Sequence, residues 1–586
     1  MAAPLRPLTL EGPLPGSERR KQRGASPEPR WLGAAPALTL AIFLLPVLLG
    51  LAGTWGPAFG FLPALGGTRT SLQPWRELIQ APGLGKAVGL ALFTGWTSTL
   101  LALFLAMGVL AAWGDSRAFA IAHRLIAPML AVPHAALAIG LAFVIAPSGW
   151  LFRVAASLSG GDRPPDILLV NDPWGLALVL GLVLKETPFL MLMALAAMGQ
   201  TRVRDSLRAA RSMGYGPVTA WGKVVLPQLY PLIRLPVFAV LAYGLSVVDM
   251  ALILGPTTPP TLAVLVFDWF NDPDLRMRFM AAAGAVLQLG LVVVSIAGAW
   301  AAERLIFRST AHILANGRRG GGRAFGRAIA GLSTAALALA LLSLAALGLW
   351  SVADRWRYPD PLPAAFTPDH WARSLPGLGH PTLVTVTAGL GATAAALLLA
   401  LGCLEHEHRA GIRPGRGAAW LLYLPLLVPQ IAFLFGLQVF LSLTRLDGTW
   451  AALIWSHLLF VLPYVFLALA DPWRALDPRY ARIAACLGAT PGRIFLRVKL
   501  PLMLRPICFA AAIGFSVSAA QYLPTLFAGA GRLPTLTTET VGLSTGADRR
   551  VVGVYAFVQM GLPLLMFVAA LAGPALAFRN RRGMHP

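Results

Sequence analysis

The polar side chains that could do chemistry in this sequence are few, and they stand inside long apolar stretches. Six of them are candidates for lining a path through a membrane: Glu186, Lys185, Asp249, Gln521, His134 and Gln430. An ionised side chain at the centre of a bilayer costs about 2.5–3.5 kcal/mol on insertion scales, so it normally pairs or faces a water-filled cavity. These residues therefore indicate either a translocation pathway or buried structural pairs.

All the candidates except Gln521 have an alternative interpretation. Lys185 and Glu186 point about 100° apart on a helix, so they need partners on neighbouring helices if they are structural. Asp249 could attract a cationic solute, or it could lie near the outer end of its span, where water solvates it. His134 and Gln430 each follow a proline, and both could be interhelical hydrogen-bonding groups, worth on the order of 0.6 kcal/mol.

The sequence contains no motif that indicates an enzyme. No G-x-x-x-x-G-K-[ST] loop for phosphate binding occurs. No Ser/His/Asp, paired-carboxylate or Cys/His constellation stands out, and Cys403, Cys486 and Cys508 lack metal-ligand spacing. We therefore expect no catalytic residue, no metal site and no cofactor in this chain.

A segment of 23 residues occurs twice, at 205–227 (the first elbow) and 479–501 (the second elbow), and the register of 274 residues holds without a gap. Matching positions are Arg208 and Arg482, Ala210 and Ala484, Gly214 and Gly488, Trp221 and Phe495, and Leu226–Pro227 and Leu500–Pro501. Each copy predicts a helix, a glycine that ends it in the left-handed conformation, and a second helix that begins at a proline. The chain is an internal duplication, and each elbow predicts a docking surface on which Trp221 or Phe495 contacts a partner.

Composition identifies the elements that position these residues. The chain is 57% hydrophobic and 12% charged, which is typical of a polytopic membrane protein. Apolar runs of about 20 residues can cross a bilayer. They lie near 33–53, 86–113, 124–146, 174–198, 232–255, 280–302, 328–350, 379–404, 418–443, 451–471, 503–529 and 551–578. We predict an all-α fold of about 12 transmembrane helices in two parallel six-helix repeats.

The basic residues set the predicted organisation and orientation. The segments are a basic tail (1–32), a first six-span domain (33–302, with its loop at 201–230), a basic linker (303–327), a second six-span domain (328–578, with its loop at 472–502) and a tail (579–586). Arginine is concentrated in the tails, elbows and linker, so the net charge of +23 reflects the positive-inside bias and predicts no nucleic acid partner. Both termini and both elbows are then cytoplasmic. Parallel halves predict a pseudo-two-fold axis with the pathway between them.

The spacing within the elbows resembles that of a known family. It reads Ala209-Ala210-x-x-x-Gly214…Leu226-Pro227 in the first elbow and Ala484…Gly488…Leu500-Pro501 in the second. This pattern resembles the EAA loop of ABC importer permeases, and the fused two-domain arrangement is similar to that of iron and thiamine permeases. The family glutamate is replaced by Arg208 and Arg482, so the resemblance implies docking by shape and not through that carboxylate.

The resemblance implies the permease subunit of a type I importer in a bacterial inner membrane, moving a small solute such as iron, thiamine, a polyamine or a phosphonate. Its partners would be two copies of an ATPase subunit that uses ATP and Mg²⁺, an external solute-binding protein, and membrane lipid. The alternatives are an ion-coupled secondary transporter with 12 spans, for which Glu186 and Asp249 are the candidate acids, and a polytopic membrane enzyme. The secondary transporter has no use for two elbows, and the enzyme would need a cluster of catalytic side chains at one membrane face, which the sequence does not show. The sequence does not identify the solute.

Overall fold

The computed structural model describes residues 30–113, 128–199, 202–317, 319–320, 322–412 and 415–579. Within these ranges the chain is helical, with two isolated β-bridges and no strand. Ten described helices are long and apolar enough to cross a membrane, or up to twelve if two bent helix pairs each count as one span. The predicted polytopic all-α fold is confirmed. Most of the two predicted tails, and the start of the third predicted span, lie outside the described residues.

The described part of the first half consists of long helices separated by several short ones. They are α1 (Arg30–Ala58), α2 (Gln73–Gln80), α3 (Leu84–Trp113), α5 (His134–Ile145), α6 (Trp150–Ser159), α7 (Leu176–Gly199), α8 (Val203–Ser212), α9 (Pro217–Ala220), η2 (Trp221–Val225), α10 (Leu226–Ser246), α11 (Asp249–Leu254), α12 (Leu262–Phe270) and α13 (Met277–Ala315). A further short turn, η1, covers Pro63–Leu65.

The second half repeats this order. Its elements are α14 (Arg323–Val352), α15 (Asp369–Ala410), α16 (Arg416–Leu427), α17 (Gln430–Leu443), α18 (Trp450–Arg474), α19 (Pro478–Cys486), α20 (Pro491–Ile494), η3 (Phe495–Lys499), α21 (Leu500–Leu502), α22 (Leu504–Ala519), α23 (Leu523–Gly529), α24 (Leu536–Ser544) and α25 (Arg549–Ala577). The shift of 274 residues found in the elbows continues outward: α12 and α24 keep it at both ends. Even the π-helical turns η2 and η3 coincide in this register.

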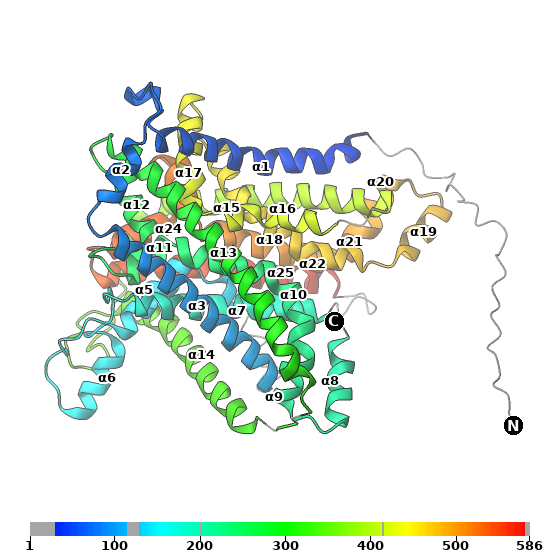
Figure 1. The fold of residues 1–586 in the computed structure, drawn as a ribbon, viewed down its shortest axis with the longest axis horizontal. Helices are drawn as coiled ribbons and strands as arrows, with labels where there is room; N and C mark the ends of the chain where they lie inside the picture. The colour runs from blue at the N-terminus through cyan, green and yellow to red at the C-terminus, as the bar shows by residue number, and fades with distance from the viewer. Residues whose placement is uncertain are drawn as a thin grey trace.

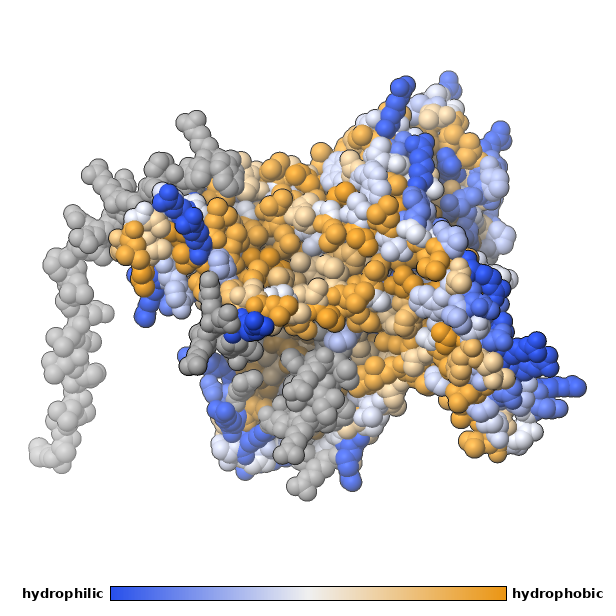
Figure 2. Space-filling model, turned by 180° about the vertical axis from the view of Figure 1, so that it is seen from behind, coloured by the Kyte–Doolittle hydropathy of each residue, from blue (hydrophilic) through white to orange (hydrophobic). Residues whose placement is uncertain are grey.

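The surface has the pattern expected of a membrane protein. Figure 2 shows apolar residues in a broad belt across the middle of the molecule, with hydrophilic residues gathered toward its two ends. In Figure 1, α2, α6 and α12 lie at one end and the two elbows at the other. A belt of this kind favours burial in hydrocarbon, because lipid solvates apolar side chains and water solvates the ends.

The first helix of each half packs on the other half. The indole of Trp455 in α18 donates to the carbonyl of Ile42 in α1 (2.9 Å), and the hydroxyl of Thr54 in α1 accepts from the amide of Gly436 in α17 (3.2 Å). A side chain at Gly436 would collide with the backbone of α1, and one at Gly140 of α5 would collide with the backbone of α14. Glycine at these two positions lets helix backbones approach closely, as small residues do in membrane proteins.

Candidate functional site

The first elbow has the helix–glycine–helix form that the sequence predicts. Helix α8 ends at Ser212, and Gly214 takes a left-handed conformation (φ +84°). The amides of Gly214 and Tyr215 then bond back to the carbonyls of Arg211 (2.9 Å) and Ala210 (3.2 Å), which satisfies carbonyls at the helix end. Pro217 begins α9, where its missing N–H costs nothing.

The second elbow repeats this geometry with stronger caps. The carboxylate of Asp477 accepts from the amide of Arg479 at the start of α19 (2.8 Å), and Gly488 ends the turn with φ +81°. The hydroxyl of Thr490 accepts from the amide of Arg493 (3.4 Å), and Pro491 begins α20. Figure 1 shows α8 and α9 at the same end of the molecule as α19 and α20. The two copies therefore share one local geometry.

The aromatic residues of the elbows differ from the prediction. Trp221 is only 4% exposed, within a cluster that includes Val225 and Leu229, so it cannot contact a docked partner. Phe495 is half-buried against Trp473, with ring centroids 6.0 Å apart. The prediction that these two rings contact the partner is wrong for Trp221, because a large ring gains more by packing under the elbow than by facing water. Both aromatic side chains instead anchor the elbows to the helices below.

The other predicted elbow residues divide into an exposed set and a covered set. Exposed are Arg208, Ala209, Gly214, Arg482 and Gly488; buried or half-buried are Ala210, Leu226, Pro227, Ala484, Leu500 and Pro501. Arg208 lies 3.7 Å from Asp205 in an exposed ion pair. The exposed set forms the outer surface of each elbow, and the covered set joins the elbow to the membrane helices.

Sequence reasoning missed the apolar surface of the second elbow. Ile483, Leu487 and Leu496 are 59%, 83% and 62% exposed, although each is a large apolar side chain. Ile483 and Leu487 form a groove with three neighbouring residues, Arg479, Arg482 and Cys486. The sequence did carry a signal for this surface. Ile483 and Leu487 are four residues apart, which places them on one face of a helix, beside arginines.

A buried ion cluster under the second elbow was also missed. The carboxylate of Glu405 in α15 lies 2.7 Å from the Arg409 guanidinium and 2.6 Å from the Lys499 ammonium in η3. Arg409 also donates to the carbonyl of Pro491 (3.4 Å). In the first half, Glu303 of α13 binds Arg234 of α10 (2.8 Å). These buried pairs connect the segments next to the elbows to long membrane helices, and breaking one would leave an unpaired charge.

Lys185 has a structural role. Its ammonium donates to the carbonyls of Met129 (3.3 Å), Leu130 (3.1 Å) and Val132 (2.5 Å), just before Pro133. A proline prevents the helix from continuing, so these carbonyls lack their usual amide donors. The Lys185 ammonium thus supplies the donors that these carbonyls lack at the helix break, and it does not pair with Glu186.

The remaining acidic candidates form a chain of contacts across four helices. The imidazole Nε2 of His134 in α5 lies 3.4 Å from the Glu186 carboxylate in α7, and its ring lies 4.9 Å from the ring of Tyr243 in α10. The hydroxyl of Tyr243 donates to the Asp249 carboxylate in α11 (3.3 Å). Asp249 is 7% exposed, so it is not solvated at the outer end of a span. Both carboxylates are therefore buried within the membrane helices.

The glutamines of the second half do not mirror this cluster. Gln521 lies in the break between α22 and α23 and donates to the carbonyl of Val517 (3.0 Å), and Gln430 is the half-buried first residue of α17. Asp249 and Gln521 do not occupy corresponding positions of the two halves, because the shift of 274 residues pairs Asp249 with Leu523. The break between α10 and α11 and the matching break between α22 and α23 therefore carry different polar residues.

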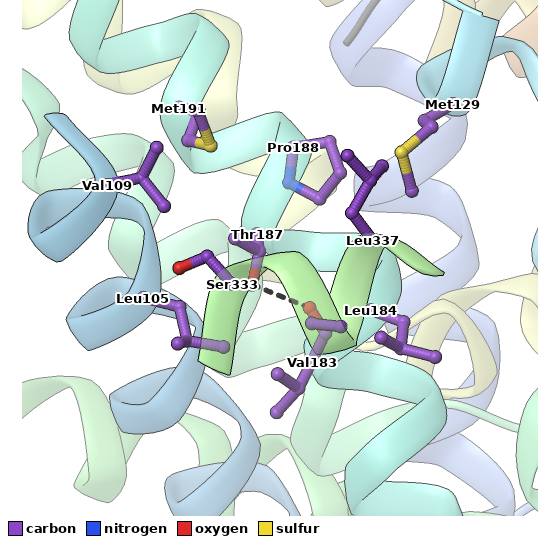
Figure 3. Close-up of a pocket in the computed structure, with 11 residues that line it drawn as sticks. Leu105, Val109, Met129, Val183, Leu184, Thr187, Pro188, Met191, Ser333 and Leu337 are labelled. Atoms are coloured by element: carbon purple, nitrogen blue, oxygen red, sulfur yellow. Dashed lines mark hydrogen bonds between the residues drawn. The ribbon is translucent and has the colours of Figure 1, made fainter. Parts of the chain in front are cut away.

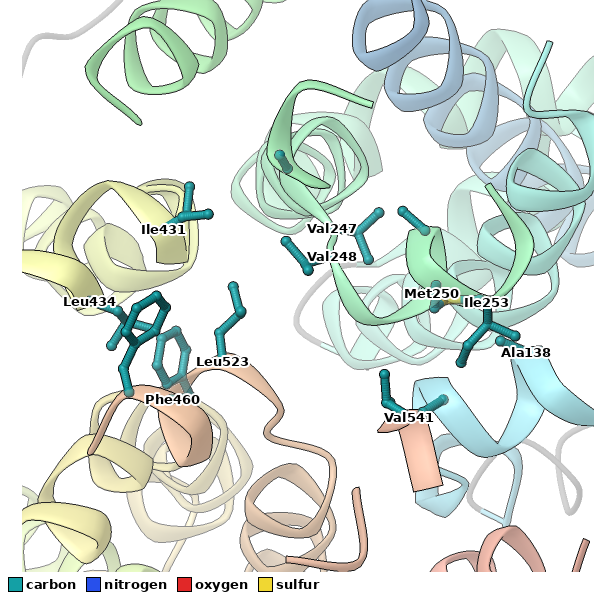
Figure 4. Packing of buried hydrophobic residues seen from close by; sticks show 14 of the residues in the cluster. Ala138, Val247, Val248, Met250, Ile253, Ile431, Leu434, Phe460, Leu523 and Val541 are labelled. Atoms are coloured by element: carbon teal, nitrogen blue, oxygen red, sulfur yellow. The ribbon is translucent and has the colours of Figure 1, made fainter. Parts of the chain in front are cut away.

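Apolar and aromatic residues surround these breaks. Figure 4 shows Val247 and Val248 of the first break on one side and Ile431, Leu434 and Leu523 on the other. Farther toward the α2 and α12 end, Phe270 of α12 stacks on Phe435 of α17 (centroids 4.2 Å apart) and meets Phe527 of α23 edge-on (6.4 Å). These rings hold the two halves together at the end opposite the elbows.

A small apolar cavity lies beside the polar chain but belongs to the packing. Its volume is about 70 Å³, and it lies between α3, α7 and α14 (Figure 3). Its polar groups include Thr187, whose hydroxyl already donates to the carbonyl of Val183 (2.7 Å). No charged side chain lines it, so it offers nothing to hold a polar solute. Within the described ranges no group of three or more His, Cys, Asp or Glu side chains could hold a metal ion.

The fold and the paired elbows together define a duplicated, all-helical membrane permease. No family model matches the chain. It is 32% identical over 536 residues to the inner membrane ABC transporter permease protein YnjC of Escherichia coli strain K12, which covers 91% of this chain and 96% of that protein. The chain belongs to the ABC transporter permease family, and it is a multi-pass protein of the inner membrane.

Shorter matches fall on permeases with different named solutes. The putrescine transport system permease protein PotI of Escherichia coli strain K12 is 29% identical over 171 residues, which is 28% of this chain and 60% of PotI. The molybdenum transport system permease protein ModB of Mycobacterium bovis is 28% identical over 218 residues, which is 35% of this chain and 81% of ModB. The named solutes include a polyamine and molybdenum, so likeness to these permeases does not define the solute of this chain.

Proposed function

We propose that this chain is the permease subunit of an ATP-driven importer and that it supplies both membrane domains of the transporter. The observation that carries the proposal is the pair of elbows with the same local geometry at one end of the molecule. On the second elbow, Leu487 and Ile483 expose apolar surface beside arginines, away from the apolar belt. Exposed apolar surface rimmed by polar residues is typical of a protein interaction site.

The partner at each elbow is a separate ATPase subunit, so that one duplicated chain binds two copies and ATP and Mg²⁺ are used by the partner. The elbows, the linker and both termini are cytoplasmic in this arrangement, which agrees with the concentration of arginine in these segments. A solute-binding protein docks at the opposite end, near α2, α6 and α12.

Closure of the ATPase pair moves the elbows and, through the buried Glu405 and Glu303 ion pairs, the membrane helices attached to them. The Phe270–Phe435 contact between the halves is the outer gate, and it separates when the elbows approach each other. The solute then passes the buried Glu186 and Asp249 on its way inward. The Lys185 ammonium binds backbone carbonyls and does not neutralise these two carboxylates. The carboxylates therefore favour a cationic solute among the iron, thiamine, polyamine and phosphonate classes.

Reconstitution tests the proposal. Proteoliposomes that hold the chain, the candidate ATPase subunit and the loaded binding protein should accumulate solute only with ATP and Mg²⁺. A protonophore should not change the initial rate. Uptake that needs an ion gradient and no nucleotide-hydrolysing subunit, and that disappears in Glu186→Gln or Asp249→Asn, would instead identify a secondary transporter.

A further inference from the structure

The linker between the two halves makes direct contact with the first elbow. The ammonium of Lys223 donates to the backbone carbonyl and the side-chain oxygen of Asn316, each at 2.7 Å. The amide of Gly216 donates to the carbonyl of Arg319 (3.3 Å), and the hydroxyl of Thr219 donates to the carbonyl of Gly320 (2.5 Å). Four polar contacts therefore join the elbow to the segment between α13 and α14.

Packing reinforces these hydrogen bonds. The Tyr215 ring lies 5.6 Å from the Lys223 ammonium and 5.9 Å from the Arg319 guanidinium, both within range of cation–π attraction. Val218 lies against Gly322 so closely that a Cβ there would come within 2.9 Å of the Val218 side chain. Gly322 has φ +56°, a conformation that glycine adopts without cost. The linker backbone thus follows the elbow surface closely.

The second elbow lacks the side chains that make these contacts. In the register of 274 residues, Tyr215 corresponds to Ala489, Val218 to Gly492, Thr219 to Arg493 and Lys223 to Arg497. The aromatic ring and the hydroxyl are absent there, and Gly492 is exposed where Val218 is half-buried. The side chains that contact the linker on the first elbow are therefore replaced by different ones at the matching positions of the second elbow.

We propose that Asn316, Arg319, Gly320 and Gly322, which we call the linker brace, form part of the docking surface of the first elbow. The two surfaces offered to the ATPase pair are then unequal. One is a composite of elbow and linker that presents Arg319, and the other is a bare elbow that presents the apolar Ile483 and Leu487. The claim that the two docking surfaces are unequal rests on the proposed ATPase partner. The contact between the linker brace and the first elbow does not.

Cysteine labelling of the full-length chain tests the brace. In a background with Cys486→Ser and Cys508→Ser, the variant Val218→Cys reports the braced position, and Gly492→Cys is the matched position on the second elbow. A hydrophilic maleimide should label Val218→Cys at least about fivefold more slowly than Gly492→Cys, because a covered site reacts only through local opening. Equal rates at the two positions would overturn the proposal.

A second variant shows whether the named contacts produce the protection. Adding Tyr215→Ala and Lys223→Met should bring the Val218→Cys rate to within about twofold of the Gly492→Cys rate and leave the latter unchanged. A slow rate that persists in this variant would also overturn the brace. The ATPase subunit is then added to the Gly492→Cys variant, whose cysteine lies on the second elbow. If the subunit does not slow the labelling of this cysteine, that result counts against the proposed docking, independently of the brace result.

Discussion

The left-handed glycine of the second elbow provides a perturbation whose cost can be worked out from the structure. Gly488 has φ +81°, and no atom lies within 4 Å of the position that a Cβ would occupy. A substitution therefore meets no steric clash with neighbouring segments and acts only through the backbone. An L-residue in this conformation costs about 1–2 kcal/mol, and a β-branched residue costs more. That energy disfavours the native elbow angle by about 5- to 30-fold.

Two control substitutions separate backbone strain from the bulk of the new side chain. Gly488→Asn should be tolerated, because asparagine adopts the left-handed conformation more readily than other non-glycine residues. Gly492→Ala adds a methyl group to the same exposed elbow but lies inside helix α20, where alanine is favoured over glycine by about 0.5–1 kcal/mol. Neither control should change the elbow angle.

The assay is ATP hydrolysis stimulated by the loaded binding protein in proteoliposomes, normalised to the amount of inserted chain. Stimulation should be near the wild-type level for Gly488→Asn and Gly492→Ala, lower for Gly488→Ala and lowest for Gly488→Val. Insertion should be unchanged, because the elbow lies outside the apolar belt. Wild-type stimulation in Gly488→Val, or a larger loss in Gly488→Asn than in Gly488→Ala, would refute the reasoning.

Four further substitutions, one of them a control, test other parts of the account. Phe270→Ala removes the aromatic contact between the halves, at a total packing cost of about 3–5 kcal/mol, and should raise solute leak without ATP in a flux assay; an unchanged leak would argue against an outer gate. Glu405→Gln leaves Lys499 without its carboxylate and should cost about 3–5 kcal/mol, seen as a lower unfolding temperature. Glu407→Gln, at a more exposed pair, should cost about 0–1 kcal/mol, and equal effects would contradict this assignment. Gly436→Leu forces α1 away from α17 and should reduce the amount of folded protein in the membrane; normal levels would show that this crossing is dispensable.

Local rules were sufficient to predict the elbows. The left-handed Gly214 and Gly488, the Asp477 and Thr490 caps and the helix starts at prolines all follow from interactions within a few residues. The spans could be predicted for a similar reason, because length and apolar composition determine whether a segment crosses a bilayer. The duplication added a second, independent copy of each signal.

Features that depend on contacts between distant segments could not be predicted in this way. The packing of α1 on α17 brings Ile42 to Trp455, and the sequence carries no periodic signal for such a crossing. The burial of Trp221 and the carbonyl partners of Lys185 also depend on tertiary packing. The role of the glycines at 140 and 436 at a contact between helix backbones also required the structure.

The account depends on both elbows touching a nucleotide-hydrolysing partner. Met213 and Leu487 occupy the same position of the two elbows and are 54% and 83% exposed. A photocrosslinking amino acid placed at either position in the transporting complex should form an adduct with the ATPase subunit, and adding ATP should change the yield at both. Active transport with no adduct to a nucleotide-hydrolysing protein at either position would contradict the central claim.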